Sequence, residues 1–208
     1  MVRSIKEEHG IKCRRHKRFK VTTDSNHNKM VYPNVLDQKF DAKRPNESWV
    51  SDITYIWTSE GWLYLAGVKD LYINELVGYA INKRMTADLV CKALDMAINN
   101  KHPSQGLIVH SDRGSQYSRH AYHKIIKQHL FTGSMSVKGN CFDNAPIESF
   151  WGTLKNELVY HQDYKTRFAT ISDIIGYIEL YYKQTRIQKS LGYKSPRQVW
   201  FDFYSQAA

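Results

Sequence analysis

WVSDITYIWT, residues 49–58, and WLYLAGVKD, residues 62–70, are the stretches of sequence that decide the fold. Both are rich in β-branched and aromatic residues, which favour extended strands. The dipeptide Glu60-Gly61 between them is typical of a hairpin turn, and ELVGYAINKR, residues 75–84, predicts a third strand. Because the connections are short, the three strands are expected to form an antiparallel meander.

The segments after this meander alternate between helix and strand. Residues 86–102 carry apolar side chains at helical spacing behind a candidate N-cap, Thr86. LIVHSD, residues 107–112, is a short apolar run that ends in polar residues, which indicates a buried parallel strand. A helix over 118–130 and a short strand over 131–136 follow. The order predicts an α/β protein of the ribonuclease H-like fold, with a mixed five-stranded sheet flanked by helices.

Two more helices are expected towards the C-terminus. APIESFWGTLKNELVY, residues 145–160, follows a loop that contains glycine and asparagine. The last long helix is expected to begin near Thr170 or Ser172 and to run to about Gln184.

The net charge of +10 is concentrated near the N-terminus. Residues 1–45 contain 12 Lys/Arg and 5 Asp/Glu, so +7 of the charge lies in the first fifth of the chain. A basic arm before a nearly balanced domain indicates a polyanionic partner, usually nucleic acid. A solvated basic tail is the alternative.

Composition also indicates the cellular compartment. No stretch approaches the ~20 apolar residues that cross a bilayer, and the charged N-terminus does not have the pattern of a signal peptide. The three cysteines are odd in number and widely spaced, which argues against a disulfide framework and favours a reducing cytoplasm. A hydrophobic share of 42% is ample for a buried core.

Asp52 interrupts the apolar pattern of the first strand. Alternation places it on the face of Val50, Thr54 and Ile56, which is expected to be covered. An unpaired carboxylate on such a face is costly unless a cation or hydrogen bonds compensate. Asp52 is therefore a candidate metal ligand, and an aspartate that bonds a neighbouring loop is the alternative.

Asp112 and Glu148 stand at two further positions suited to chemistry. Asp112 follows an apolar strand at its carboxyl end, where ligands gather in open α/β sheets, although a turn aspartate is also expected there. Glu148 lies in the first turns of the helix 145–160, where a capping acid is common. Gly152 and Lys155 share its stripe of the helix, and the glycine leaves the open space that a substrate groove needs.

Together, the three carboxylates predict a magnesium site. Hard divalent cations prefer oxygen ligands and keep several waters, so two or three convergent carboxylates suffice. Two such ions about 4 Å apart activate an attacking oxygen and stabilise the leaving oxygen in phosphodiester displacement. We expect Asp52, Asp112 and Glu148 to hold two Mg²⁺ ions, for which Mn²⁺ substitutes.

Three strings closely resemble the catalytic motifs of the retroviral-integrase-like DDE transposases. They are WVSDITYI (49–56), LIVHSDRGSQY (107–117) and GNCFDNAPIESFWGTLKNEL (139–158). The 35 residues between Asp112 and Glu148 match that family's spacing. The chain is most similar to the OrfB-type transposases of bacterial insertion sequences, which are produced from two overlapping reading frames. The similarity extends over about residues 1–200 and includes YYKQTRIQKSLGYKSPRQV near the C-terminus.

The resemblance implies a role for individual residues. Asp52, Asp112 and Glu148 match the metal-binding catalytic triad, and Lys155 matches a basic residue that contacts the transposon end. Such enzymes nick the 3′ end of the element with water and then use the freed 3′-hydroxyl to attack a phosphodiester. The resemblance therefore implies a DNA transposase catalytic domain that performs metal-dependent 3′-end nicking and strand transfer of an insertion sequence.

Four segments are expected on this basis. Residues 1–20 resemble the basic end of a truncated, helical DNA-binding segment, and residues 21–47 a polar linker. Residues 48–165 match the integrase-like catalytic core, on which a C-terminal helix and tail, 166–208, are expected to pack.

The resemblance also implies partners. They are DNA, as transposon ends and as target, further copies of the chain assembled on that DNA, and the upstream reading-frame product that supplies end recognition. The expected location is the bacterial cytoplasm, in association with the nucleoid and without a membrane contact.

Candidate DNA contacts lie on the basic arm, the loop before the helix 145–160, and that helix itself. They are Arg14, Arg15, Lys17, Arg18, Lys138, Asn144 and Lys155. Solvated charges and ordinary turn formers are the alternatives at these positions.

Several alternatives remain open. Asp70 and Asp143 are further potential ligands, although a turn aspartate and a helix cap or loop former are the expected roles, and His110 is more typical of a packed histidine than of a site residue. A DNA-binding regulator without catalysis and a nuclease of the same fold are the rival functions.

Overall fold

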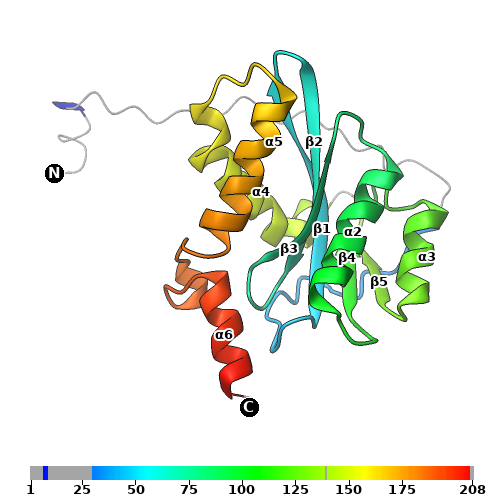
Figure 1. Cartoon of the computed structure of the whole chain (residues 1–208). Coiled ribbons are helices and arrows are strands. Elements are labelled where there is room, and N and C mark those ends of the chain that lie inside the picture. The colour runs from blue at the N-terminus through cyan, green and yellow to red at the C-terminus, as the bar shows by residue number, and fades with distance from the viewer. Residues whose placement is uncertain (1–6, 9–29, 139, 207–208) are drawn as a thin grey trace.

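A mixed five-stranded sheet forms the centre of the computed structural model, which describes residues 7–8, 30–138 and 140–206 (Figure 1). The strands are β1 (Ser48–Thr58), β2 (Gly61–Asp70), β3 (Leu76–Asn82), β4 (Ile108–Ser111) and β5 (Thr132–Met135). Their order is β3-β2-β1-β4-β5. β1, β2 and β3 pair antiparallel, whereas β4 pairs parallel with β1 and β5 parallel with β4. The mixed sheet predicted from the sequence is confirmed.

Helices cover both faces of the sheet (Figure 1). α2 (Ala87–Lys101) and α3 (His120–Gln128) lie on one face, and α4 (Ala145–Glu157) and α5 (Arg167–Gly176) lie on the other. Successive residues of β1 contribute to separate cores, because Trp49 packs with the α2 side and Val50 with the α4 side. The predicted alternation is therefore confirmed, and Asp52 follows Val50 on the side of α4.

The C-terminal part differs from the prediction in two ways. The helix expected to begin near Thr170 or Ser172 begins earlier, at Arg167, because the Thr166 side chain accepts a hydrogen bond from the Ala169 amide as an N-cap. It continues as a π-helical turn, Tyr177–Tyr182. Residues 196–206, for which the sequence indicated only a tail, form a further helix, α6 (Pro196–Gln206).

The β1–β2 hairpin extends beyond its neighbours in the sheet. β1 and β2 pair as far as Thr58 and Gly61, whereas β3 pairs with β2 only from Tyr64 onward. On its other edge, β1 pairs with β4 only over Ser48–Ser51. The tip of the hairpin therefore projects at the top of the molecule in Figure 1.

The segment before β1 is only partly described. Residues 30–47 pack on the domain, with Leu36 only 2% exposed, and Gly133 admits the Tyr32 ring because a Cβ there would lie 2.5 Å from it. The predicted contacts on the basic arm lie outside the described residues: Arg14, Arg15, Lys17 and Arg18. Within the described part of the chain, no helix is long and apolar enough to cross a membrane.

Candidate active site

Asp52 and Asp112 stand side by side at the end of a parallel ladder. The pairing of β1 with β4 runs in register from Ser48 opposite Ile108 to Ser51 opposite Ser111. Asp52 and Asp112 are the next residue on each strand, so the two aspartates follow the last paired position together. Both are half-buried. The register thus brings together two carboxylates that are far apart in the sequence.

Asp52 is held against α4. Its Oδ2 atom accepts a hydrogen bond of 3.0 Å from the Trp151 indole. Burial and the neighbouring Asp112 carboxylate raise the pKa of Asp52 to about 8, and Glu148 contributes in the same direction. The negative charges at this place therefore oppose one another, and a cation would relieve that repulsion.

Gly67 makes the contact between Trp151 and Asp52 possible. It lies directly opposite Asp52 in the pairing of β1 with β2. A Cβ atom at Gly67 would lie 2.7 Å from the Trp151 ring, which is closer than side chains pack. The indole can therefore cross β2 at this glycine and reach the aspartate on β1. The sequence did not single out Trp151 as a partner of Asp52, and the signal that could have indicated it is the glycine opposite Asp52.

Asp112 and Asp52 open onto a small cavity. Asp112 accepts a hydrogen bond of 2.9 Å from the Gly114 amide, which forms a turn directly after β4. The cavity encloses about 20 Å³ and is lined by Asp52, Ile53, Tyr55, Met85, Asp112, Gln116 and Tyr117. Tyr117 is buried, and its hydroxyl accepts a 3.2 Å hydrogen bond from Ser51. The buried, hydrogen-bonded Tyr117 side chain therefore forms part of the lining next to the two carboxylates.

Glu148 approaches from the first turn of α4. Its side chain is exposed, while partial burial of the carboxyl and the nearby Asp112 raise its pKa. The start of α4 is fixed to the sheet by two contacts. The Asn144 amide donates to the Ser51 carbonyl at 3.1 Å, and the buried Lys69 ammonium donates to the Pro146 carbonyl at 3.0 Å. Glu148 is thus electrostatically coupled to the aspartates from a well-anchored helix.

The three carboxylates are suitable ligands for a hard cation, but they are not all close enough to bind a single ion. Within residues 7–8, 30–138 and 140–206, no three His, Cys, Asp or Glu side chains are close enough to hold one ion. Asp52 and Asp112 lie together, and Glu148 acts on them at longer range. Carboxylate oxygens are the ligands that Mg²⁺ prefers, and this ion is usually bound by one or two carboxylates plus water and substrate phosphates. The residues present therefore fit a magnesium ion, with Glu148 as the ligand that must approach.

Lys155 and Gly152 border the same region. The Lys155 ammonium lies 4.9 Å from the centre of the Tyr55 ring. Burial lowers its pKa, and the Asp52 carboxylate opposes that shift, which places the lysine within electrostatic reach of the aspartate. A Cβ atom at Gly152 would meet nothing within 4 Å, so the surface above this part of α4 is open.

Two other predicted DNA contacts differ from each other in exposure. Lys138 is exposed on the loop after β5. Asn144 is only 4% exposed, and its amide nitrogen faces the Ser51 carbonyl rather than solvent. Because Ser51 immediately precedes Asp52, Asn144 ties the start of α4 to the strand that carries the first carboxylate.

Asp143 anchors the loop in front of α4. It is fully buried and accepts four hydrogen bonds, of 2.8 to 3.1 Å, from Asn34, Gln38, Asn140 and the Val137 amide. Two of these donors belong to the segment before β1, which is distant in the sequence. The loop-shaping role that the sequence indicated for Asp143 is therefore confirmed, and the long-range partners are new.

Asp70 and His110 also have structural partners. The buried Asp70 carboxylate accepts hydrogen bonds from the Asn46, Tyr72 and Ile73 amides and from the Trp49 indole. It therefore caps the turn after β2, as predicted. Both ring nitrogens of the buried His110 bond serine hydroxyls of β5 and its end, Ser134 at 2.9 Å and Ser136 at 3.2 Å.

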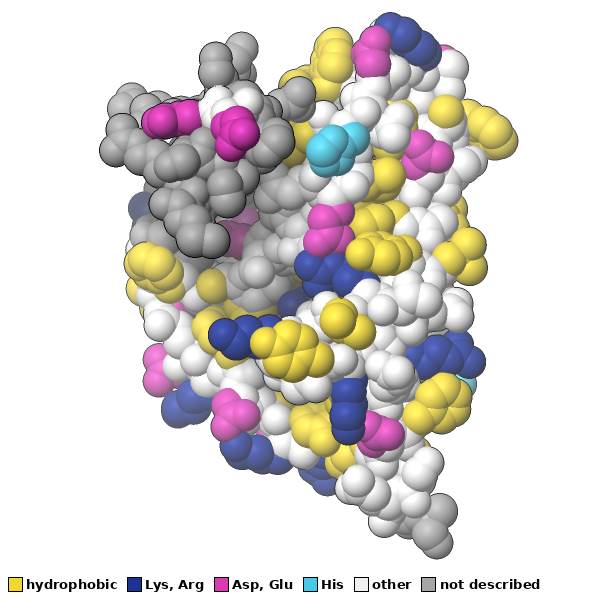
Figure 2. Space-filling view, turned by 90° about the vertical axis from the view of Figure 1, so that its left-hand side faces the viewer, with side chains coloured by type: hydrophobic (Ala, Val, Ile, Leu, Met, Phe, Trp, Pro, Cys, Tyr) yellow, Lys and Arg dark blue, Asp and Glu magenta, His cyan; other side chains and the backbone are white. Residues whose placement is uncertain are grey.

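A much larger cavity lies elsewhere. It encloses about 1020 Å³ between α4, the segment 186–194 and α6, and none of the three candidate carboxylates lines it. Basic and hydrophobic side chains intermingle over the face formed by these elements (Figure 2). Volume alone does not identify the reactive site, because the convergence of carboxylates lies at the small cavity.

Comparison with known proteins gives the family. Residues 42–141 and 148–199 match two models that are both described as an integrase core domain. A 31 kDa protein of insertion element IS600 from Shigella sonnei is 48% identical over 204 residues, which cover 98% of this chain and 75% of that protein. This chain belongs to the integrase-type transposases of insertion sequences. Transposase InsF of insertion sequence IS3A from Escherichia coli is 40% identical over 189 residues, or 91% of this transposase and 66% of InsF.

Solved structures show the fold of this transposase. A chain from the structure of a simian T-cell lymphotropic virus intasome superposes with a TM-score of 0.61 at 17% identity, over 85% of this chain and 60% of that chain. The catalytic core of HTLV-2 integrase, solved with magnesium, gives a TM-score of 0.59 at 15% identity, over 76% of this chain and 98% of that chain. The transposase therefore has the ribonuclease H-like fold of retroviral integrase cores. Its family consists of transposases, which act on DNA.

Proposed function

We propose that this transposase nicks the 3′ end of an insertion sequence and joins that end to a new phosphodiester, with Asp52, Asp112 and Glu148 as catalytic ligands. The observation that carries the proposal is that Asp52 and Asp112 directly follow Ser51 and Ser111, the last residues paired between β1 and β4. Their mutual repulsion, to which Glu148 adds, favours a divalent cation at this place.

Each carboxylate has a separate task in the proposal. Asp52 is oriented by the Trp151 indole, and Asp112 by the Gly114 amide, so both present oxygens to the cavity with little freedom. Glu148 completes the set when its exposed side chain turns towards Asp112. When bound, two Mg²⁺ ions, or Mn²⁺ in their place, supply activation of the attacking hydroxyl and stabilisation of the leaving oxygen.

DNA is proposed to lie across the open surface of α4. Lys155 borders the cavity, and the space above Gly152 allows a backbone to approach the helix. Lys138 extends the positive charge along the loop before α4. The basic arm with Arg14, Arg15, Lys17 and Arg18 supplies further phosphate contacts, so binding is expected to weaken steeply with salt.

Assembly and location are also part of the proposal. The chain spans about two thirds of InsF, and an upstream reading-frame product is proposed to supply recognition of the transposon ends. Several copies are proposed to assemble on the DNA, in the cytoplasm and in association with the bacterial nucleoid.

A strand-joining assay tests the function. The substrate is a pre-nicked duplex that carries an end of the chain's own insertion sequence, incubated with Mg²⁺ or Mn²⁺. We expect joined product with the wild-type chain and none with Asp112→Asn. Asp163→Asn is the matched control, because this exposed aspartate pairs with Lys165 at the surface.

The assay also separates the rival functions. Cleavage without joining would identify a nuclease of the same fold, and DNA binding without either reaction would identify a regulator. Joining that persists in Asp112→Asn would overturn the assignment of the carboxylates. Addition of the upstream reading-frame product is a parallel arm that tests its proposed contribution.

A further inference from the structure

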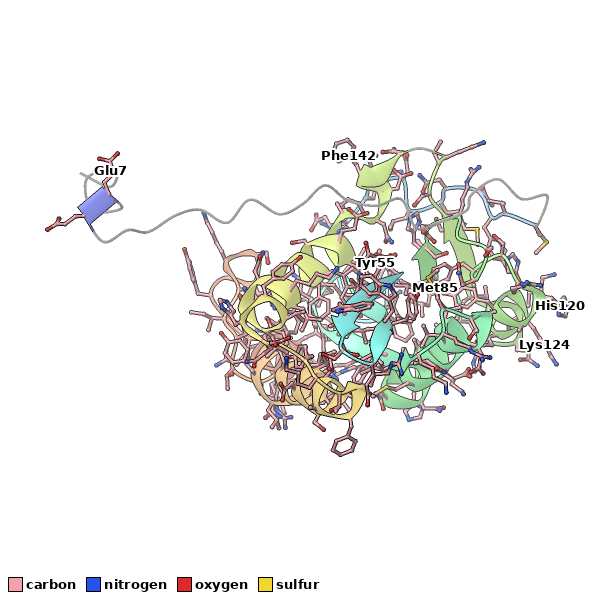
Figure 3. All side chains as sticks on the ribbon, turned by 90° about the horizontal axis from the view of Figure 1, so that it is seen from above. Glu7, Tyr55, Met85, His120, Lys124 and Phe142 are labelled. Carbon is pink, nitrogen blue, oxygen red and sulfur yellow. The ribbon has the colours of Figure 1, made fainter. Side chains whose placement is uncertain are left out.

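Three aromatic rings form a continuous row from the carboxylate cavity to the tip of the β1–β2 hairpin. Tyr55 lines the cavity together with Asp52 and Asp112. The Tyr55 ring meets Trp62 edge-on with 5.1 Å between ring centres, and Trp62 meets Trp57 edge-on at 4.8 Å. We name Tyr55, Trp62 and Trp57 the aromatic row. Figure 3 looks down on this end of the molecule and shows Tyr55 near Met85, between α4 and α2.

The outer members of the aromatic row face solvent. Trp57 is 59% exposed and Trp62 is 43% exposed, although tryptophan usually buries most of its surface. The two residues lie directly opposite each other in the hairpin. A cross-strand pair of rings supports a hairpin, which accounts for the contact between them. It does not account for the aromatic surface that both side chains leave in water next to a candidate active site.

Two cations flank the aromatic row. The Lys155 ammonium stands over the Tyr55 ring at 4.9 Å. In the hairpin, the Arg167 guanidinium donates to the Trp62 carbonyl at 3.4 Å, and the Arg167 amide donates to the Glu60 carboxylate in the turn at 2.8 Å. Positive charges therefore lie near the aromatic row on α4 and at the start of α5.

We propose that the aromatic row binds unpaired nucleotides of the DNA substrate beside the scissile phosphate. Bases stack on Trp57 and Trp62, and Lys155 and Arg167 attract the adjoining phosphates. Aromatic faces combined with cations are the chemistry by which proteins hold single-stranded DNA, and stacking accepts any base. A paired duplex exposes base edges and phosphates in its grooves, so stacking on the row requires unpaired nucleotides.

The location favours this occupant over others. The aromatic row begins at the cavity that holds the carboxylates, because Tyr55 lines it, so a strand held at the cavity can extend along the rings. The proposal rests on the proposed function for the presence of DNA there, but it adds that the strand is locally unpaired. A second copy of the chain on the same rings is the competing occupant, and the experiment includes it.

Binding of two matched oligonucleotides by the full 208-residue chain tests the proposal. One probe is a duplex with a short unpaired 3′ extension of thymidines. The other has the same phosphates, but abasic residues replace the thymidines in the extension. We expect the wild-type chain to bind the first probe roughly 5- to 150-fold more tightly, as stacking of one base predicts.

Variants assign this preference to the rings. The Trp57→Ala/Trp62→Ala double variant is expected to bind both probes equally, and Trp57→Phe/Trp62→Phe is expected to keep most of the preference. If the alanine variant does not fold, Trp57→Leu/Trp62→Leu retains apolar bulk without an aromatic face and is expected to lose the preference. Tyr204→Ala is the matched control, since Tyr204 is 43% exposed on α6 at the opposite end of the molecule (Figure 1).

Three results would overturn the inference. The first is equal affinity of the wild-type chain for the two probes. The second is a preference that survives in the alanine or leucine variant. The third is sedimentation showing that the tryptophans control oligomeric state while the preference for thymidines is unchanged.

Failure of this inference is distinguishable from failure of the proposed function. Asp112→Asn is expected to keep the preference for the unpaired thymidines while it loses strand joining. A preference without strand joining in the wild-type chain would remove only the proposed function. Normal joining without a preference would remove only the role of the aromatic row.

Discussion

Two pairs of aspartates in this molecule differ in what their carboxylates contact. Asp70 and Asp143 are fully buried, and each accepts four hydrogen bonds from the surrounding chain. Asp52 and Asp112 are half-buried and open onto a shared cavity, where each carboxylate faces the other's charge. The carboxylates of the first pair are satisfied by hydrogen bonds from the chain, whereas those of the second pair lie near each other and repel.

The difference explains why burial alone is a poor guide to function. A buried carboxylate surrounded by donors stabilises the loops that provide them. A less buried carboxylate that repels a second one costs stability until a cation arrives. The two pairs should therefore respond in opposite ways to neutralisation, and the following experiments test that contrast.

Neutralising a cavity carboxylate should have the largest effect on activity. We expect Asp112→Asn to reduce strand joining by about 1,000-fold or more, because a lost metal ligand removes about 4 kcal/mol of transition-state stabilisation. The free energy of unfolding should stay the same or rise, since the substitution also removes repulsion from Asp52. Gel-based joining rates and chemical denaturation measure the two quantities. A large loss of stability in Asp112→Asn would erase the contrast between the pairs.

Removing an anchoring carboxylate should mainly affect stability. Asp143→Ala leaves buried donors from Asn34, Gln38 and the loop after β5 without an acceptor. We expect the free energy of unfolding to fall by about 3 kcal/mol, the upper range for groups left unsatisfied. Denaturation in urea measures it. Asp143→Asn retains one acceptor oxygen and should lose less, so equal losses in the two variants would contradict the hydrogen-bonding account.

Magnesium should stabilise the chain through the cavity pair. At an Mg²⁺ concentration about 100 times its Kd, we expect the free energy of unfolding to rise by about 2.7 kcal/mol relative to the chelated protein. Thermal unfolding with Mg²⁺ and with EDTA gives the difference. Asp52→Asn should abolish most of the gain, while Asp143→Asn should keep it. A gain that survives in Asp52→Asn would place the ion elsewhere.

The smallest expected effect concerns the orientation of Asp52. Trp151→Phe removes the indole donor but keeps an aromatic ring against Gly67. We expect about a 10-fold lower rate of strand joining, since residues that orient a ligand typically contribute 10- to 100-fold. The Mg²⁺ dependence of the rate should shift to higher concentration. An unchanged rate together with an unchanged Mg²⁺ dependence would mean that the indole only fills space.

Much of the fold was predictable because its signals are local. β-branched and aromatic residues in WVSDITYIWT predicted β1, the apolar run LIVH predicted β4, and helical spacing predicted α2. The prediction was wrong where short-range signals compete. Thr166 caps α5 ahead of the expected start, and α6 begins at Pro196 in a stretch that was interpreted as a tail. A proline suits the first turn of a helix, so this signal was present in the sequence.

The carboxylates of the candidate site were predictable from the sequence, but the residues that position them were not. Asp52, Asp112 and Glu148 were identified from motifs, and their catalytic role remains a prediction for the assay to test. Trp151, Gly67 and the partners of Asp143 were not identified as parts of the site. Each of these contacts joins residues from different elements, and no local sequence pattern predicts such a contact.

The sequence by itself determined most of the elements, the charges and the family to which the chain belongs, because propensity, periodicity and motif spacing act over a few neighbouring residues. Tertiary structure alone decided the register that sets Asp52 beside Asp112, and the glycine at which Trp151 crosses β2. It also decided how far the β1–β2 hairpin extends with its exposed tryptophans. Register and close packing depend on contacts between distant segments, which exist only once the whole core has formed.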